Sequence, residues 1–555
     1  MLKHSRASES STAAVFVNRG TKRANASVVS VKAGQPFSHL PGRPASSAML
    51  QRAALEVELK LDTAAEHLDI LKKHPLFRNS RPSRKDEVVS IYLDTKDRVF
   101  RRHGLSFRLR RKGEKVLQTI KGPYRGVLDR SERETPFTGD GDDHPGAVEA
   151  FMRRLDRNLP TSLKPVFKTR IERETYRIGS IEVSLDKGEI IAGRRSSPIA
   201  EIELELKSGE RSEIFTLARQ ISAIVPAEIS VMSKSERGYD FVDGIKNQWV
   251  RARNPGLPRF STPAEAFQII CGECLHQLIS NQAGVRVHIA EALHQARVAL
   301  RRLDAAVKLF RNIQREKATK VAGELNWIGD ELASARELDV FMTDFLVPLK
   351  SKQPSDLSLA KIHGACVQLR EKAYERANAA LSSRRFRGFL IDVAEWIEAG
   401  NEQRKARSRV KGEPSAKDIV SKALSKMSRK MKAVRRIDEL DLRRLHRLRL
   451  RAKRMRYTIE FTRSLYEVNS QRIEGVLKQL GKLQTAIGKL TDMASARTIL
   501  RRLAADAEAD PRSVKPRITS RLATISRDQE RQKPKQLKKA AKAFEKLENL
   551  EPFWT

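Results

Sequence analysis

The chain has 555 residues and carries 108 Lys and Arg against 68 Asp and Glu, which gives a formal net charge of +40. So strong a positive field favours a polyanionic partner, namely nucleic acid, inorganic polyphosphate or an anionic membrane surface. No apolar run approaches the roughly 18 to 20 residues that a membrane-spanning helix needs, so we expect no membrane span. Three cysteines are too few for a disulfide framework. Together with the lack of a secretory signal pattern, they predict a cytoplasmic protein.

Changes in composition divide the chain into four parts. Residues 1–50 are rich in Ser, Ala, Arg and Lys, which predicts a disordered basic tail, although a transit peptide has a similar composition. Residues 51–245 alternate as strands do, with helices predicted at Ala64–Phe77, Gly146–Leu159 and Ser212–Ile224. Residues 246–263 contain several Pro and Gly and predict a linker. Residues 264–548 have helical periodicity and form two repeats, about 264–400 and 415–548.

Cys271 and Cys274 form a CxxC sequence inside an apolar helical stretch. No second pair follows to complete a metal site, and the apolar helical surroundings favour packing in the core over a metal or redox role. We therefore interpret these two cysteines as core residues.

Three stretches of the strand-like part alternate ionic and apolar residues. In the first, Glu56, Glu58 and Lys60 share one face, because successive strand side chains point to opposite faces. The same pattern recurs with the acidic residues Glu201, Glu203 and Glu205 and with the basic residues Arg108 and Arg110. A solvated face would explain one such strand. Three ionic faces of both signs favour a barrel whose charges line the interior.

An interior that holds charges of both signs requires ligands that balance them, because unpaired buried charges are costly. Paired carboxylates are suited to Mg²⁺ or Mn²⁺, which prefer oxygen ligands. Arg and Lys bind phosphate oxygens, and Arg often does so through two bonds at once. The residue types therefore suggest a metal–phosphate complex inside the barrel.

The ExExK sequence at Glu56–Lys60 resembles the signature of the CYTH family, the triphosphate tunnel metalloenzymes. Similar motifs follow in order over nearly the whole strand-like part. The resemblance implies an α+β protein that begins with an eight-stranded antiparallel β-barrel tunnel with flanking helices. It implies hydrolysis or cyclisation of triphosphate compounds with Mg²⁺ or Mn²⁺ held by Glu56, Glu58, Glu203 and Glu205. Lys60 and Glu201 would be catalytic, Glu201 by orienting water. The triphosphate-binding residues implied are Arg108, Arg110, Lys121, Arg133, Arg170, Lys234 and Arg237.

The helical part contains a duplicated basic pattern, H-x-x-R-x-x-x-[RK]-R. One copy begins at His294 and the other at His446, and each is followed roughly 40 to 45 residues later by a second shared element that ends in Asp339 or Asp492. Offsets of three and seven fall on one helix face, so each copy presents a histidine and cations as one stripe. Two solvated basic faces, or histidines satisfied in the core, would also fit the pattern. Metal ligation does not fit, because neighbouring cations repel a metal ion.

These stripes resemble the characteristic helices of the CHAD domain, an all-α module of two duplicated helical bundles. The sequence from Arg385 to Asp392 is also similar to that family. The resemblance implies polyphosphate binding on a central basic surface, and association with polyphosphate granules. The residues transferred to this role are His294, Arg297, Arg301, Arg302, His446, Arg449, Lys453, Arg454 and Arg456.

The function expected from the sequence is therefore metal-dependent hydrolysis of inorganic triphosphate, joined to polyphosphate binding. A polyphosphate-binding scaffold without turnover, a nucleoside or thiamine triphosphatase, and an adenylate cyclase remain alternatives. Specific nucleic-acid binding is not expected, because Phe, Trp and Tyr make up only 6% of the chain and no recognition signature is evident. The sequence carries no prediction of oligomeric state.

Overall fold

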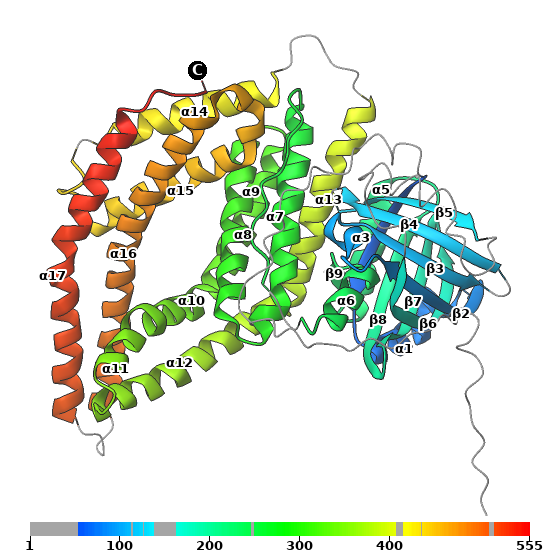
Figure 1. Cartoon of the computed structure of the whole chain (residues 1–555), viewed down its shortest axis with the longest axis horizontal. Helices are drawn as coiled ribbons and strands as arrows, with labels where there is room; N and C mark the ends of the chain where they lie inside the picture. The colour runs from blue at the N-terminus through cyan, green and yellow to red at the C-terminus, as the bar shows by residue number, and fades with distance from the viewer. Residues whose placement is uncertain are drawn as a thin grey trace, which may run out of the picture.

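The structure is a computed structural model, which describes residues 54–80, 82–112, 115–125, 127–137, 163–245, 249–406, 414–434, 436–509 and 515–554. The basic tail expected at residues 1–50 and the helix expected at Gly146–Leu159 lie outside the described residues. An antiparallel sheet forms the N-terminal part, and helices form the C-terminal part (Figure 1). The α+β order predicted from the change in periodicity is confirmed.

The N-terminal part consists of a sheet and short helices. Its strands are β1 (Ala54–Asp62), β2 (Arg84–Asp94), β3 (Ser106–Lys112), β4 (Lys115–Arg125), β5 (Asp129–Pro136), β6 (Lys164–Ile178), β7 (Ile181–Ala192), β8 (Arg195–Leu206) and β9 (Glu228–Ser230). Its helices are α1 (Ala65–Lys73), α2 (Pro75–Arg78), α3 (Val99–Arg102), α5 (Arg211–Ile224) and α6 (Lys234–Val242).

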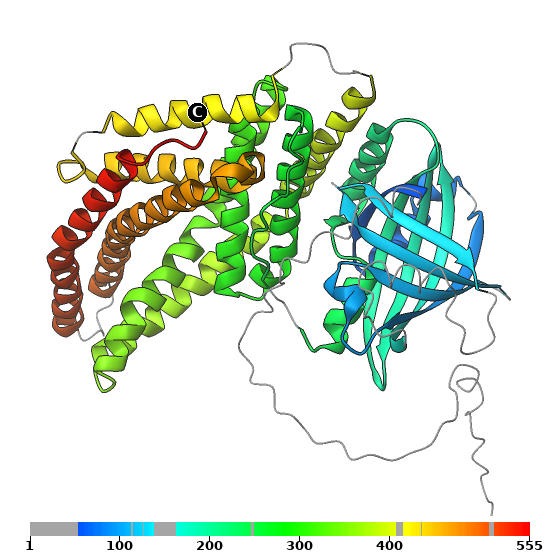
Figure 2. The same cartoon turned by 45° about the horizontal axis from the view of Figure 1, so that its top comes forward.

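The sheet has nine strands in the described residues, in the order β5-β4-β3-β2-β6-β7-β8-β1-β9, and not the eight strands of the expected barrel. The extra strand is β9, which pairs with Lys60–Asp62 of β1. Further back along β1, Ala54–Val57 pair with β5 instead. The sheet is therefore joined to itself over only part of β1, and the prediction of a fully closed eight-stranded barrel is wrong. Figure 2 shows the strongly curved sheet that results.

Both faces of β1 are buried. Leu59 and Leu61 belong to the core formed with α1 and α5, and each is at most 1% exposed. Glu58 and Lys60 point to the opposite face, yet each is only 6% exposed. The ionic face of this strand is thus an interior face, as the alternation predicted.

Tight hairpins carry the chain from β6 to β7 and from β7 to β8. Gly179 and Gly193 lie in these turns with φ of 57° and 61°, a left-handed conformation that costs glycine little. The two hairpins fix the register between the three strands, with Arg173 opposite Asp186 and Asp186 opposite Glu201.

The C-terminal part is helical throughout its described residues. Its elements are α7 (Pro263–Arg286), α8 (Ala290–Leu309), α9 (Arg315–Glu331), α10 (Ala333–Val340), the π-helical turn η2 (Phe341–Leu346), α11 (Val347–Lys352), α12 (Leu357–Leu381), α13 (Arg384–Ala406), α14 (Ala416–Lys432), α15 (Leu442–Thr462), the 3₁₀ turn η3 (Arg463–Asn469), α16 (Ser470–Ala509) and α17 (Lys515–Glu548). Thr262 with Glu265, and Ser415 with Asp418, form capping boxes at the starts of α7 and α14, which satisfy backbone donors that the first turn leaves free.

The segment predicted as a linker packs against the helical part. Asn281 of α7 bonds to both the amide and the carbonyl of Val250, each at 3.0 Å. The carbonyl of Arg253 accepts from Arg302 at 2.9 Å, and Leu257 is buried. Val250 and Arg253 of this connection are therefore bound to α7 and α8, respectively.

The sheet and the helices share one continuous core. Phe215 of α5 and Phe389 and Trp396 of α13 belong to the same buried cluster, and both views place α13 beside α5 (Figures 1 and 2). Ion pairs cross this boundary, including Arg219 with Asp392 and Arg286 with Glu228. None of the helices described is long and apolar enough to span a membrane.

Cys271 and Cys274 are fully buried in α7 with free thiols. Burial raises the pKa of Cys274 to about 12 and also raises that of Cys271. Their interpretation as core residues is confirmed.

Candidate functional site

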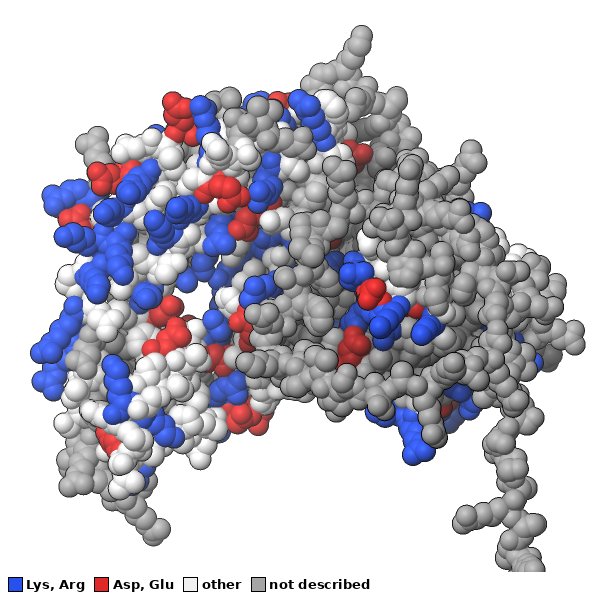
Figure 3. Space-filling model, viewed as in Figure 1, with Lys and Arg blue, Asp and Glu red and all other residues white. Residues whose placement is uncertain are grey.

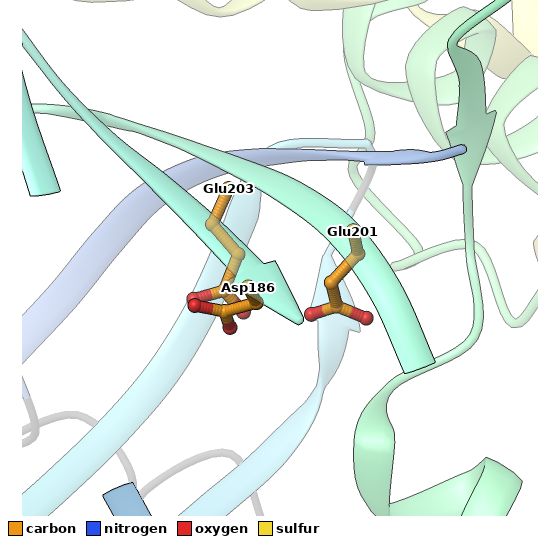
Figure 4. Close-up of side chains that lie close together, drawn as sticks. All are labelled: Asp186, Glu201 and Glu203. Carbon is orange, nitrogen blue, oxygen red and sulfur yellow. The ribbon is translucent and has the colours of Figure 1, made fainter. Parts of the chain in front are cut away.

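Three buried carboxylates meet on β7 and β8. Asp186 and Glu201 are direct partners across the two strands, and Glu203 follows Glu201 on the same face. One oxygen from each of the three lies within 4.8 Å of the others. Figure 4 shows the three side chains side by side on the inner face. Asp186 and Glu201 are completely buried, so these carboxylates must be balanced by cations.

Lys234 and Arg173 supply that positive charge. Lys234 begins α6, whose start is fixed by the capping box of Ser233 and Glu236. Its Nζ lies 2.7 Å from Asp186 and 3.2 Å from Glu203, and it also contacts Glu201. Arg173 holds Asp186 through two bonds, of 2.7 and 2.6 Å. The ammonium of Lys234 therefore lies among the oxygens that a metal ion would use.

Strand β1 brings its own ionic residues beside this cluster. Lys60 lies opposite Glu203 and bonds to it at 2.7 Å, and its Nζ is 3.8 Å from Glu58. Glu58 lies opposite Glu205 across β1 and β8, so two like charges face each other. Glu205 is partly neutralised by Lys207 at 2.6 Å. The four carboxylates predicted to bind metal thus share the interior, and Asp186 joins them.

Glu56 belongs to a neighbouring group with Lys121 and Glu132. Lys121 Nζ is 2.9 Å from Glu56 and also contacts Glu132. Burial, together with a hydrogen bond to Glu132, raises the pKa of Glu56 to about 8. Burial alone would raise the pKa of Glu132, but the bond to Glu56 and the charge of Lys121 lower it to about 2. Glu132 was missed from sequence, although it alternates with Glu134 along β5 and so shares its face.

Arg108 and Arg110 of β3 form the basic side of the interior. Arg108 is 7% exposed and lies 3.6 Å from Glu132. Neither Nε atom has a hydrogen-bond partner among the described residues, although both are buried. Burial, and then the like charges of Arg108 and Arg173, lower the pKa of Arg110 to about 10. Buried guanidinium groups with free donors fit a phosphate group, which would supply the missing acceptors.

The carboxylates fit a divalent cation by their chemistry and their charge. Burial alone would raise the pKa of Glu203, but Lys234, Lys60 and Arg173 hold it well below the usual range, so it is ionised. Burial raises the pKa of Glu201, and its Oε2 has no hydrogen-bond partner within the described part of the chain. Buried oxygens of this kind suit a hard cation.

Two of the residues predicted to bind triphosphate lie outside the interior. Arg170 points to the outer face of β6, where its side chain is 54% exposed beside Glu87. Arg133 is exposed on β5, because Glu132 and Glu134 take the inward positions. Both assignments are corrected on geometry, with Arg173 in the place expected for Arg170. Arg237 does reach the interior, where it contacts Asp62 and lies 3.9 Å from Glu201.

In the helical part, the two basic stripes of α8 and α15 face each other. Burial, followed by the charges of Arg301 and Arg449, lowers the pKa of Lys453 to about 6. Burial and Arg301 likewise lower the pKa of Arg297 to about 10. We call Arg297, Arg301, Arg449 and Lys453 the basic cluster. The pKa values of Arg297, Arg449 and Lys453 are lowered first by burial, and the neighbouring cations lower them further.

The histidines lie at the edges of the basic cluster. Burial and the charge of Arg336 lower the pKa of His294 to about 4. His446 is exposed, and burial together with Arg449 also lowers its pKa. Asp492 on α16 is the acid that faces Arg449 and Lys453. The second element of the repeat has diverged in role, because Asp339 bonds instead to Arg370 at 2.7 Å and to Tyr374 at 2.8 Å.

The remaining residues of the two stripes occupy different places. Arg302 is 3% exposed and pairs with Glu460 at 2.9 Å, with its guanidinium over the ring of Phe461. Arg456 bonds to the same Glu460 at 2.7 Å. Arg302 therefore belongs to an ion pair in the core, and we remove it from the predicted binding set. Arg454 is half-buried and lies outside the basic cluster. Figure 3 shows Lys and Arg side chains gathered over the helical half, around a hollow.

Comparisons with known proteins agree with this division. The CYTH domain model matches residues 54–239, and the CHAD domain model matches residues 269–501. An inorganic triphosphatase of Haemophilus influenzae is 30% identical over 216 residues, which cover 36% of this chain and 59% of that protein. This chain thus spans less than two thirds of the length of that relative.

Solved structures are similar to parts of this chain. The CHAD domain from the plant Ricinus communis has 23% identity and a TM-score of 0.45, and the match covers 54% of this chain and 96% of that one. PptA from Streptomyces chartreusis has 16% identity and a TM-score of 0.38 over 51% of this chain and all of that one. On the evidence of both family models, this chain is a CYTH domain followed by a CHAD domain.

Proposed function

We propose that the sheet domain hydrolyses inorganic triphosphate with Mg²⁺ or Mn²⁺, and that the helical domain binds polyphosphate. The proposed hydrolysis rests on the interior of the sheet domain. There a cluster of carboxylates lies beside guanidinium groups whose Nε donors have no hydrogen-bond partner among the described residues. A metal–triphosphate complex has both the charge and the oxygen atoms that such an interior would bind. The similarity to an inorganic triphosphatase favours that substrate over nucleoside or thiamine triphosphates.

The metal ligands in this proposal are Glu56, Glu58, Glu203 and Glu205, with Asp186 added by the geometry. When bound, the metal would neutralise charge on the phosphate oxygens and orient the reacting groups. Arg108, Arg110, Lys121, Arg173 and Arg237 would hold the phosphate chain. Lys234 and the metal ion would compete for the same carboxylates. When metal is bound, Lys234 would therefore be expected to contact a phosphate oxygen in place of the carboxylates.

Lys60 and Glu201 take the catalytic roles. Lys60 Nζ lies between Glu203 and Glu58, where it can stabilise charge that develops on a transferred phosphoryl group. The free Oε2 of Glu201 can accept a hydrogen bond from the attacking water. Its raised pKa makes it a better proton acceptor than an ordinary carboxylate.

Release of phosphate from tripolyphosphate, ATP and thiamine triphosphate tests this proposal directly. The full chain is assayed with Mg²⁺, with Mn²⁺ and with a chelator. We expect turnover of tripolyphosphate that exceeds turnover of the other two and stops when metal is removed. If none of the three substrates is hydrolysed, the protein is a binding scaffold. Faster hydrolysis of ATP or thiamine triphosphate, or release of cyclic AMP from ATP, would replace the proposed substrate.

Polyphosphate binding by the helical domain rests on the basic cluster. Its cations lie close enough to lower one another's pKa values in addition to the effect of burial, and a flexible polyanion would relieve that repulsion. Competition between long-chain polyphosphate and DNA of equal total charge tests the preference. Equal affinity would indicate general electrostatic attraction, which falls steeply with salt. A preference for polyphosphate would fit a protein of the cytoplasm that associates with polyphosphate granules.

A further inference from the structure

A carboxylate from the helical domain is buried against the sheet domain. Glu398 lies on α13 and is only 1% exposed. Its Oε1 accepts from the backbone amide of Val127 at 2.8 Å, and its Oε2 accepts from Arg211 at 2.9 Å. Both partners belong to the sheet domain. Burial raises the pKa of this carboxyl group, and the bonds from Val127 and Arg211 offset only part of that desolvation cost.

The residues that Glu398 holds form the connection from β4 to β5. Arg211, at the start of α5, also binds Asp129, so Glu398, Arg211 and Asp129 form one chain of charges. Val127 precedes Leu128, which is completely buried. Glu398 therefore restrains residues 127–129 from one side through a backbone bond and from the other through Arg211.

Residues 127–129 also contact β1. The carbonyl of Leu128 accepts from the amide of Glu58 at 3.1 Å. Asp129 pairs with Val57 across β1 and β5, and Glu56 lies one step further along that pairing. We call residues 54–58 and 127–132 the seam, because there the first and fifth strands meet. Its position decides where Glu56 and Glu58 point.

Docking of the two domains does not account for Glu398. Arg219 of α5 already binds Asp392 and contacts Glu395 on the same helix, and Lys320 binds Asp392 as well. The pairs made by Arg219 are roughly one third exposed, and neither they nor the pair made by Lys320 includes a residue of the seam. The Glu398 contacts lead to residues 54–58 of β1, whereas the pair of Arg286 with Glu228 leads through β9 to the other end of that strand.

We propose that Glu398 is a positioning residue through which the helical domain fixes the seam, and with it the carboxylates of Glu56 and Glu58. The inference rests on the proposed function in taking these carboxylates as metal ligands. Its consequence is that the sheet domain depends on the helical domain for a well-placed metal site, in addition to being tethered to it.

The test compares three variants of the full chain, Glu398→Ala, Glu398→Gln and Asp392→Ala. The third removes a carboxylate from the same helix and the same boundary without touching the seam. Hydrogen exchange of residues 54–62 and Mn²⁺ affinity by calorimetry are measured for each. For Glu398→Ala we expect faster exchange of β1 and Mn²⁺ binding weaker by roughly 10-fold, typical of losing a group that orients a metal ligand. Glu398→Gln keeps one acceptor oxygen for the amide of Val127 but loses the acceptor that faces Arg211, so it should lie between that variant and the unaltered protein.

The outcomes separate the inference from the proposed function. Equal exchange of β1 and equal Mn²⁺ affinity in Glu398→Ala and Asp392→Ala would overturn the positioning role, even if both variants melt at lower temperature. If Glu398→Ala does not fold, the near-isosteric Glu398→Gln keeps the comparison available. An unaltered protein that hydrolyses no triphosphate would contradict the proposed function, and the exchange of β1 would still decide whether Glu398 fixes the seam.

Discussion

The interior of the sheet domain and the basic cluster of the helical domain are both rich in buried cations, but they are balanced in opposite ways. In the sheet domain, Lys60, Lys234 and Arg173 each bond to carboxylates. In the helical domain, burial and neighbouring cations lower the pKa values of Lys453 and Arg297, although Asp492 lies near the first and Glu337 and Asp330 lie near the second. The first site holds its charges in a stable internal arrangement. The second remains short of negative charge until a ligand arrives.

This difference predicts different ligands for the two domains. A balanced interior exchanges one set of ion pairs for another, so a cation and an anion must enter together. An unbalanced cluster accepts a polyanion alone, because each added phosphate lowers the repulsion among the cations. Mutations can therefore break one site without affecting the other.

Removing the central carboxylate should have the largest effect. Glu203→Gln keeps the shape of the side chain and removes the charge that Lys60, Arg173 and Lys234 share. We expect tripolyphosphate turnover to fall by at least ~100-fold, beyond the loss known for groups that only orient metal ligands. Phosphate release measures the change, with Glu87→Gln on the outer face as the matched control. Polyphosphate binding should be unchanged, and a parallel loss there would contradict two independent sites.

Charge reversal in the basic cluster should break the helical site alone. The variant with Arg297, Arg301 and Lys453 replaced by Glu is expected to lose polyphosphate binding, since three attractive contacts become repulsive. The control replaces Arg443, Arg444 and Arg447, which are exposed on α15, by Glu and changes the net charge equally. Binding is measured by calorimetry at two salt concentrations. Equal losses in both variants would show that the overall field attracts polyphosphate and that no particular site does.

The pH dependence of binding sharpens the contrast between the two sites. The pKa of Lys453 is about 6 without ligand, and a bound polyanion should raise it. Binding then takes up a proton between these two pKa values, so affinity is greatest below pH 6 and falls as pH rises through 7 to 9. The slope should be at most about tenfold per pH unit for one group. In Lys453→Arg the slope should be absent, because arginine keeps its charge over this range.

Arg302 should matter for stability and not for binding. Its removal in Arg302→Met leaves Glu460 with Arg456 but without its buried partner, and breaking such a pair costs about 3–5 kcal/mol. Denaturant unfolding should show this loss, whereas polyphosphate affinity at a temperature where the variant is folded should not change. A weaker affinity would return Arg302 to the binding set.

Alternation along strands predicted much of the sheet domain's interior. It placed Glu58, Lys60 and Glu203 on inward faces, where the structure has them. The same rule, applied strictly, would have excluded Arg170, because the inward residues of β6 have odd numbers such as Ile171 and Arg173. Motif matching chose Arg170 because it lies within the same short run of residues. A spacing error of one residue moves a strand side chain to the other face.

Helical periodicity predicted less well which side chains face the core, because neighbouring faces of a helix are not sharply separated. Arg301 and Arg302 are neighbours in the repeat, yet Arg302 turns into the core and pairs with Glu460, which lies 158 residues away in sequence. The seam could not be predicted either. It depends on Glu398 meeting Val127 across 271 positions, and no local pattern marks a carboxylate for such a contact. The strand β9, with three residues, is too short to give a periodic signal.

The position of Lys234 among the carboxylates has a consequence for the protein when metal is scarce. Structural zinc modules unfold when a chelator removes their ion, because metal binding supplies much of their free energy of folding. In this chain Lys234 and Arg173 already occupy that place and keep Asp186 and Glu203 paired. If the sheet domain hydrolyses triphosphate as proposed, loss of metal should therefore stop turnover without unfolding the chain, and addition of metal to the same protein should restore it.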